Sequence, residues 1–241
     1  MKSILLSLSG MLLFSSQMHA AVIVKYVPTG SAGSSVVNAT TVDPQVTASA
    51  IGDIGTGGTQ LLSGAAGPIR TTNGSWTFGA DGWLFANASG DGTNGTASST
   101  ADYFSFSLST PGAETLSLTS FTFDYGVGTN TTGQSGNFHY AVFASVNGGA
   151  YAQIGSTFST GNLSLTQNVT NVIGNRSVDL SSITGADSVA FRVWVGSTNA
   201  SASTGSIFQN IIVNGSVVPE PSAVMLGGLG VLVLMRRRRA A

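Results

Sequence analysis

Apolar and polar residues alternate along much of the middle of the chain. In residues 103–108, Phe104, Phe106 and Leu108 share one face of an extended segment, while serines occupy the other face. Successive side chains of a strand point to opposite faces, so a period of two is typical of a strand with one buried side. No segment of the middle shows sustained helical periodicity, and the pattern therefore predicts an all-β domain.

One change of phase in this pattern predicts a bulge. The aromatic residues of segment 121–125 alternate with polar ones, but the leucines of segment 116–118 are out of phase with them by one residue. An extra residue in one strand shifts the alternation in this way, so we expect a β-bulge near Ser120.

Turn residues predict how the strands connect. Residues 138–146 alternate, and Asn147-Gly148-Gly149 follows as a hairpin turn, because successive positive-φ positions favour Asn and Gly. Residues 150–154 are then the return strand. Further strands are expected at 163–169, 177–180, 189–195 and 207–213.

The strand at 189–195 is expected to turn Val189, Phe191, Val193 and Val195 inward. Arg192 then points outward, with Trp194 on the same side. Several short strands separated by Gly, Asn and Ser turns predict an antiparallel β-sandwich, in particular a jelly roll. The Gly-rich, poorly patterned segment 47–68 is interpreted as a mobile surface loop.

Composition narrows the class of protein. With roughly 20 residues set aside at each end, the 241-residue chain leaves one domain, residues 21–217, large enough to bury a core. Cysteine is absent, so a disulfide framework and a thiolate metal site are excluded. Without Lys2 and the four terminal arginines, the chain keeps four basic residues against all ten acidic ones, a balance of about −6. The domain has no basic face to neutralise phosphates, which argues against nucleic-acid binding.

The N-terminus has the layout of a secretory signal peptide. Lys2 precedes an apolar stretch from Ile4 to Phe14, and a polar segment ends at Ala20. A positive charge, an apolar stretch and a small residue at the end are the parts of such a signal. We therefore expect residues 1–20 to direct export through the Sec translocon and to be removed by signal peptidase after Ala20. The alternative is a buried first helix.

The C-terminus, residues 218–241, ends in an apolar run and four arginines. The run Ala223 to Met235 is 13 residues long. As a helix it reaches roughly 20 Å, whereas a hydrocarbon core is about 30 Å thick. It predicts a short transmembrane helix that spans only marginally. Basic residues stay cytoplasmic, so the cluster Arg236, Arg237, Arg238 and Arg239 leaves the domain outside the inner membrane.

Two prolines flank a single acid just before this run. Pro219 and Pro221 fix their own φ angles and push the residues before them towards extended geometry. The result is a stiff stub that holds the Glu220 carboxylate close to the membrane surface. A membrane-embedded processing enzyme could read such a stub in extended form.

This tail resembles the PEP-CTERM sorting signal of Gram-negative bacteria, with its Pro-Glu-Pro tripeptide, short apolar helix and arginine cluster in the same order and spacing. In that family an exosortase, a membrane cysteine peptidase, recognises the tripeptide and removes the anchor. The resemblance implies that Pro219, Glu220 and Pro221 are substrate residues for another enzyme. It also implies transient anchoring in the inner membrane, followed by transfer to the cell surface or the exopolysaccharide matrix. An ordinary single-pass tail anchor is the alternative.

A second resemblance covers the domain. Leu116–Asp124, the Asn147-Gly148 turn, Val178-Asp179-Leu180 and Phe191-Arg192 occur in this order in many PEP-CTERM proteins. Residues 103–218 resemble the jelly-roll, lectin-like domains of those proteins.

Candidate catalytic groups are few. His139 is the only histidine outside the signal peptide, and the chain has no Gly-x-Ser-x-Gly elbow, which favours a surface histidine over a general base. Glu114 is the only glutamate inside the domain and follows a Pro-Gly turn, whereas glycosidase chemistry needs two carboxylates. No catalytic residue is assigned, and we expect the protein not to be an enzyme.

Calcium is the one metal with a case, because it takes oxygen ligands on flexible loops. Asp81-Gly82, Asn87, Asp91-Gly92 and Asn94-Gly95 could supply such oxygens, but no twelve-residue ligand pattern is present. We prefer plain turns as their role, and we assign no metal and no other cofactor.

Tryptophans are the candidate sugar contacts, since each offers a flat apolar face with a polar handle. Trp83 and Trp194 are the candidate carbohydrate-stacking residues, and Trp194 is the better candidate for exposure, because it lies opposite the inward face of its strand. Packing in the core is the alternative role.

The sequence therefore predicts an exported, non-enzymatic protein of the cell surface, or of the extracellular biofilm matrix, with the exosortase as partner and exopolysaccharide as candidate ligand. A polysaccharide hydrolase or lyase is the first alternative. An ice-binding or adhesive surface is the second, and the chain shows no regular Thr-x-Thr ladder for it.

Overall fold

The computed structural model describes residues 21–27, 36–53, 84–87, 103–129, 132–133, 135–166, 170–198 and 204–219. The described residues form strands and turns and contain no helix, so the all-β prediction is confirmed there. The strands are β1 (Ala21–Tyr26), β2 (Val36–Val37), β3 (Thr41–Val42), β4 (Thr47–Ala48), β5 (Ile51–Asp53), β6 (Leu84–Asn87), β7 (Tyr103–Ser109), β8 (Glu114–Thr129), β9 (Ser135–Val146), β10 (Ala152–Ser164), β11 (Thr170–Asp179), β12 (Ser188–Thr198) and β13 (Thr204–Pro219).

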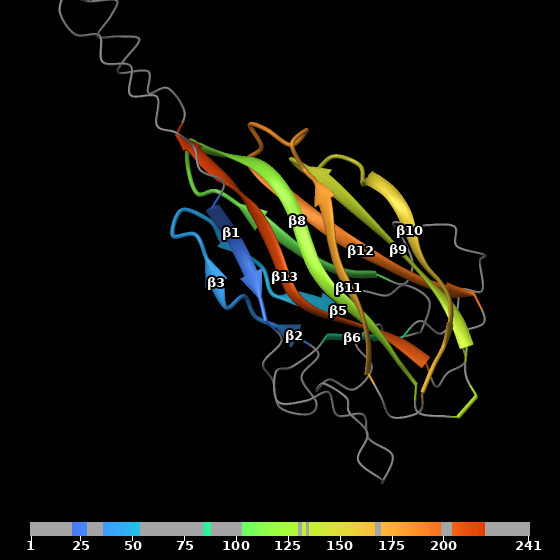
Figure 1. Ribbon diagram of the computed structural model, residues 1–241. Helices are drawn as coiled ribbons and strands as arrows, with labels where there is room; N and C mark the ends of the chain where they lie inside the picture. Colours follow the sequence, from blue (N-terminus) through green and yellow to red (C-terminus); the bar gives the residue numbers. More distant parts are fainter. Residues whose placement is uncertain are drawn as a thin grey trace, which may run out of the picture.

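The strands form two antiparallel sheets that face each other (Figure 1). Sheet A has the order β11-β8-β13-β1-β3, with β6 also paired to β13, and sheet B has the order β10-β9-β12-β7-β5-β2, with β4 also paired to β7. Strands that follow each other in the chain often lie in different sheets, as β8 and β9 do. The arrangement is consistent with the predicted β-sandwich, and the finer jelly-roll assignment stays a prediction.

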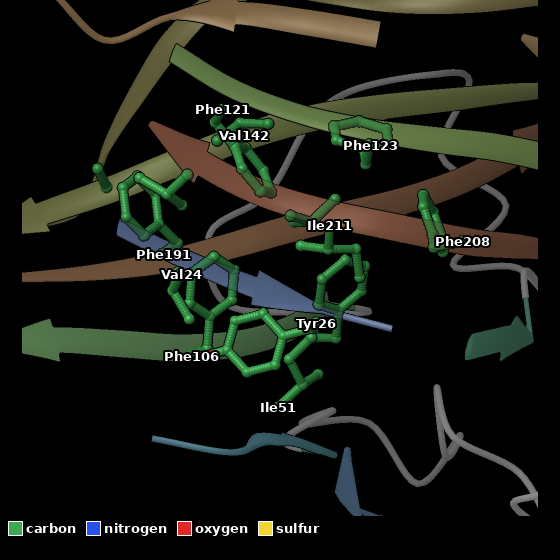
Figure 2. Close-up of a cluster of buried hydrophobic side chains, with 14 of the residues drawn as sticks. Val24, Tyr26, Ile51, Phe106, Phe121, Phe123, Val142, Phe191, Phe208 and Ile211 are labelled. Carbon is green, nitrogen blue, oxygen red and sulfur yellow. The ribbon is translucent and has the colours of Figure 1, made fainter. Parts of the chain in front are cut away.

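Aromatic side chains from both sheets fill the space between them (Figure 2). The centroids of the Phe191 and Phe106 rings, both in sheet B, are 5.2 Å apart. The centroid of Phe191 lies 5.6 Å from that of Phe121 in sheet A. Tyr26 lies fully buried beside them, and its hydroxyl donates a hydrogen bond to the Ser49 carbonyl at 2.6 Å. Pairs of this geometry contribute beyond the area that they bury, so one aromatic core holds the two sheets together.

The bulge and the hairpin turn are confirmed. In the pairing of β13 with β8, Asn214 lies opposite Ser120 and the next residue, Gly215, lies opposite Leu118, so Thr119 is the extra residue. The leucines before it and the phenylalanines after it are all buried, which explains the change of phase. At the turn, Asn147 and Gly148 have φ angles of 50° and 73°, as the Asn-Gly pair predicts.

Two predictions are wrong: the strand expected to begin at residue 163 and the loop expected to begin at residue 47. Residues 163 and 164 do not begin a separate strand, because β10 continues from Ala152 through both of them. Gly155 and Gly161 have positive φ angles at the two places where the pairing of β10 with β9 is irregular, and the pairing continues beyond each of them.

Segment 47–53 is not a mobile loop, because β4 and β5 pair with β7 and Ile51 is fully buried. Residues 54–68 lie outside the described residues.

The two ends of the chain also lie outside the described residues. The predicted signal peptide, residues 1–20, and the tail from Glu220 to Ala241 therefore stay predictions as far as their structure is concerned. In the part of the chain that the structure describes, no helix has the length and apolar character needed to cross a bilayer.

Candidate functional site

The last strand of the domain runs directly into the proline-flanked acid. β13 ends at Pro219, which is exposed and immediately precedes Glu220. The strand lies inside sheet A, with β8 on one side and β1 on the other. No linker separates the domain from the candidate processing motif, because the first proline of the motif is the last residue of the strand.

The end of β13 is held by the start of β8. Pro219 lies opposite Glu114, and Val218 lies opposite Thr115. The Glu114 carboxylate accepts a hydrogen bond of 2.7 Å from the Gln45 side-chain amide, and the Glu114 carbonyl accepts one from the Thr110 hydroxyl. Through these two hydrogen bonds, Glu114 holds the start of β8, which is the part of the sheet that pairs with the end of β13.

A glycine permits the close approach of the two strands just before this end. A Cβ atom on Gly215 would lie 2.5 Å from the Ser117 carbonyl oxygen and 2.9 Å from the Leu118 Cα. Real side chains do not come so close to a neighbouring backbone, so only glycine fits next to the Thr119 bulge without a shift of β8.

The two ends of the described domain meet at this same end of sheet A. Ala21, the first residue after the predicted signal-peptide cut, lies opposite Gly215, four residues before Pro219 (Figure 1). β13 has 16 residues and therefore spans about 50 Å, so termini at opposite ends of the sheet would lie that far apart. Because Ala21 and Gly215 are paired, the first described residue and the last strand lie at the same end of the sheet.

We call this region, formed by residues 110–114, Asn147, Asp187 and Pro219, the junction end. Hydrogen bonds join its loops: the Thr110 N–H donates to the Asp187 carbonyl at 3.0 Å, and the Asp187 N–H donates to Asn147 Oδ1 at 2.8 Å. Its charged groups are carboxylates. Among the described residues, the nearest cation along these strands is Lys25, opposite Ile212 and thus seven residues before Pro219. The junction end therefore offers no described cation to anionic lipid.

The structure reaches only part of the predicted site. Pro219 is placed as above, whereas Glu220, Pro221 and the cluster Arg236, Arg237, Arg238 and Arg239 lie outside the described residues. Ala20 also lies outside them, and Trp83 does so as well. Their roles in sorting, in membrane orientation, in signal-peptide cleavage and in sugar stacking stay predictions.

The predicted exposure of Trp194 is wrong. The side chain lies on the outer side of its sheet, as its place in the alternation indicates, but it is fully buried. Its ring packs with Ala141, Phe143 and Tyr151 and lies over the Cα of Gly196. A buried ring has no free face, so Trp194 cannot stack on a sugar in this structure.

The structure does not bring Glu114 and His139 together. Glu114 lies at the junction end in sheet A, whereas His139 lies in β9 of sheet B. The junction end of β9 is Val146, and His139 is seven residues away from it, about 24 Å along the strand. Burial lowers the pKa of His139, and its Nε2 has no hydrogen-bond partner among the described residues. A concerted acid–base step needs the two groups on one substrate, which this separation does not permit.

The candidate calcium ligands are almost entirely outside the described residues. Asp81, Asp91 and Asn94 are among those not described, and only the backbone of Asn87 is placed, at the end of β6. In the described part of the chain, no three His, Asp or Glu residues come together in a way that could hold a metal ion.

The outer face of sheet B carries a cluster that the sequence reasoning missed. The Arg192 guanidinium carbon lies 4.3 Å from the centroid of the Tyr103 ring and 3.8 Å from that of Tyr151. Both distances are typical of cation–π contacts. The alternation placed Arg192 outward, but nothing in it showed that a tyrosine of β7 and the tyrosine just before β10 would meet there. We call Tyr103, Arg192 and Tyr151 the tyrosine–arginine cluster.

Comparison with protein-family models finds a match in the tail. The family model described as the PEP-CTERM protein-sorting motif matches residues 217–239. The match confirms the resemblance in the tail, and it begins two residues before the end of β13. The motif implies an exported protein that carries a membrane-anchored sorting signal and is processed by an exosortase. The comparison with curated proteins finds no significant match.

Proposed function

We propose that the chain is an exported structural or binding protein, not an enzyme, and that an exosortase frees its β-sandwich from the membrane for the cell surface or the exopolysaccharide matrix. One observation carries the proposal: the sorting motif matches residues 217–239, where a complete strand of the domain ends. The last described strand of the domain thus leads directly into the signal, which suits a cargo that is handed over whole.

The chemistry of the tail supports this use. The apolar run of residues 223–235 is shorter than the hydrocarbon core of a bilayer. It can span only if the bilayer thins locally or if the flanking side chains extend to the membrane surface. The arginines keep its end cytoplasmic. Such a segment anchors the chain long enough to be recognised and is then dispensable.

Intact-mass analysis of the exported protein, from hosts with and without a working exosortase, tests the proposal. We expect loss of the arginine tail and appearance in the medium or matrix only in the host with the enzyme. Glu220→Gln should keep the tail attached, while Glu114→Gln serves as the matched control, because it changes the carboxylate opposite Pro219 and leaves the motif intact. An exported product that still carries its arginines in the competent host would end the proposal.

An acidic exopolysaccharide is the ligand that we propose, and the tyrosine–arginine cluster supports it. The half-buried Tyr151 ring lies beside the Arg192 guanidinium on the outer face of sheet B. An aromatic ring next to a positive charge suits a sugar ring that carries a carboxylate. Tyr151 also packs against the cluster that contains the buried Trp194.

Retention of the released domain on immobilised acidic polysaccharide tests this ligand. Tyr151→Ala should weaken retention about tenfold, the equivalent of about 1.4 kcal/mol. Val146→Ala, which removes another solvent-exposed apolar side chain of sheet B, should leave it unchanged. Equal retention of both variants and the parent would remove the cluster as the site. Polysaccharide cleavage lost in Glu114→Gln or His139→Ala would favour the enzyme alternative.

A further inference from the structure

We infer that the exosortase cuts on the C-terminal side of Pro219, so that the released protein keeps the whole of β13 and Pro219 with it. The inference rests on the proposed function and narrows it to a set of bonds: the cut lies at Pro219–Glu220 or beyond. Nothing in the motif itself places the bond, and the argument comes from the pairing of the last strand.

The pairing of β13 continues to its last residue. On β8, the partners of the final residues run in sequence from Leu118 opposite Gly215 to Glu114 opposite Pro219. The Leu116 N–H donates to the Ala186 carbonyl at 2.7 Å, on the other side of β8. Because N–H groups alternate along a strand, those of Thr115 and Ser117 point to β13 instead. The last residues of β13 therefore lie in a strand ladder.

A peptidase that binds an extended substrate uses the same backbone groups. Main-chain hydrogen bonds of the β-augmentation kind need the N–H and C=O groups of the substrate, and in Val218 these are taken up in the ladder with Thr115. A cut before Pro219 would require this end of the strand to separate from β8 first. A cut after Pro219 keeps all of β13 on the released side, and the ladder stays paired where the segment that the enzyme binds also lies after Pro219.

Packing opposes that separation. Leu116 and Leu118, which face the end of β13, are fully buried or nearly so, and Gly215 is buried against the Ser117 carbonyl. Val217 packs on the same core. Loss of these residues from the sheet would expose apolar side chains at the junction end to water, which is unfavourable.

The full chain, processed in an exosortase-competent host, provides the first test. Intact mass and C-terminal peptide sequencing of the released protein should place its last residue at Pro219 or at a later position. A product that ends at Val218 or earlier would overturn the inference while leaving exosortase processing intact. A chain that is never cut would remove the proposed function, and the inference with it.

A second test measures whether the strand must open. When a protease acts on a transiently opened segment, its rate follows the population of the open form. Thr115→Pro removes an N–H that points to β13 and loosens the strand end, and Thr115→Ala is its matched control. In pulse-chase labelling we expect processing rates for both variants within about twofold of the parent. Processing several-fold faster in Thr115→Pro alone would show that the cut lies within the ladder, contrary to the inference.

Discussion

Ala21 and Gly215 lie opposite each other in the antiparallel pairing of β1 with β13. The residue that follows the predicted signal-peptide cut is thus paired with the residue four positions before the end of β13. The predicted signal peptide and the sorting signal therefore adjoin the same end of sheet A.

The close approach at Gly215 predicts a large effect of a single methyl group. Gly215→Ala would place a Cβ 2.5 Å from the Ser117 carbonyl oxygen, and the strands must move apart to admit it. We expect the free energy of unfolding to fall by about 1–3 kcal/mol, the usual cost of overpacking. Urea denaturation of the released domain measures it. Gly52→Ala is the control, since nothing lies within 4 Å of its Cβ position, and equal effects of the two substitutions would contradict the prediction.

The ring of Trp194 lies over Gly196, which makes the tryptophan a reporter. A Cβ on Gly196 would overlap the ring atoms Cη2 and Cζ2, so Gly196→Ala should push the ring out of its buried place. In a background with Trp76→Phe and Trp83→Phe, we expect the fluorescence emission to shift to longer wavelength as the indole meets water. Emission unchanged from that background would show that the ring adapts without leaving its site.

A buried hydrogen bond joins the two sheets at Tyr140 and Ser206. Their hydroxyl oxygens lie 2.9 Å apart, both side chains are fully buried, and burial raises the pKa of Tyr140. Ser206→Ala should cost about 1–3 kcal/mol, because it leaves the tyrosine hydroxyl unpaired in the core. Tyr140→Phe combined with Ser206→Ala should cost less than the sum of the two single changes. A strictly additive double-mutant cycle would mean that the bond contributes nothing.

The pKa of His139 predicts how stability depends on pH. Burial lowers this pKa in the folded state, so at acid pH the unfolded chain binds the proton more readily than the folded one. Its stabilising contribution is therefore complete above the unfolded pKa of about 6.5 and is lost as the pH falls towards the folded value. Denaturation at several pH values between 5 and 8 should show this loss, and His139→Gln should flatten the curve. A loss of the same size in His139→Gln would assign it to other groups.

Local patterns in the sequence were sufficient for several features of the fold. The change of phase between Leu118 and Phe121 predicted the bulge now seen at Thr119, and the Asn147-Gly148 pair predicted the turn. Both are decided within a few residues, by alternation and by the positive φ that a turn demands. The sorting signal was readable for the same reason, since its prolines, apolar run and arginines are contiguous.

Other features depended on residues far apart in the chain, and only the tertiary structure decided them. Alternation told which side of β12 carries Trp194, but not that Phe143 and Tyr151 would bury it, because period two says nothing of what covers a face. The same holds for Arg192 between its tyrosines and for the pairing of Ala21 with Gly215. The sequence by itself determined the strongly alternating strands, the Asn-Gly turn and the sorting signal; the packing of distant segments determined which side chains are exposed and that the signal begins on a paired strand.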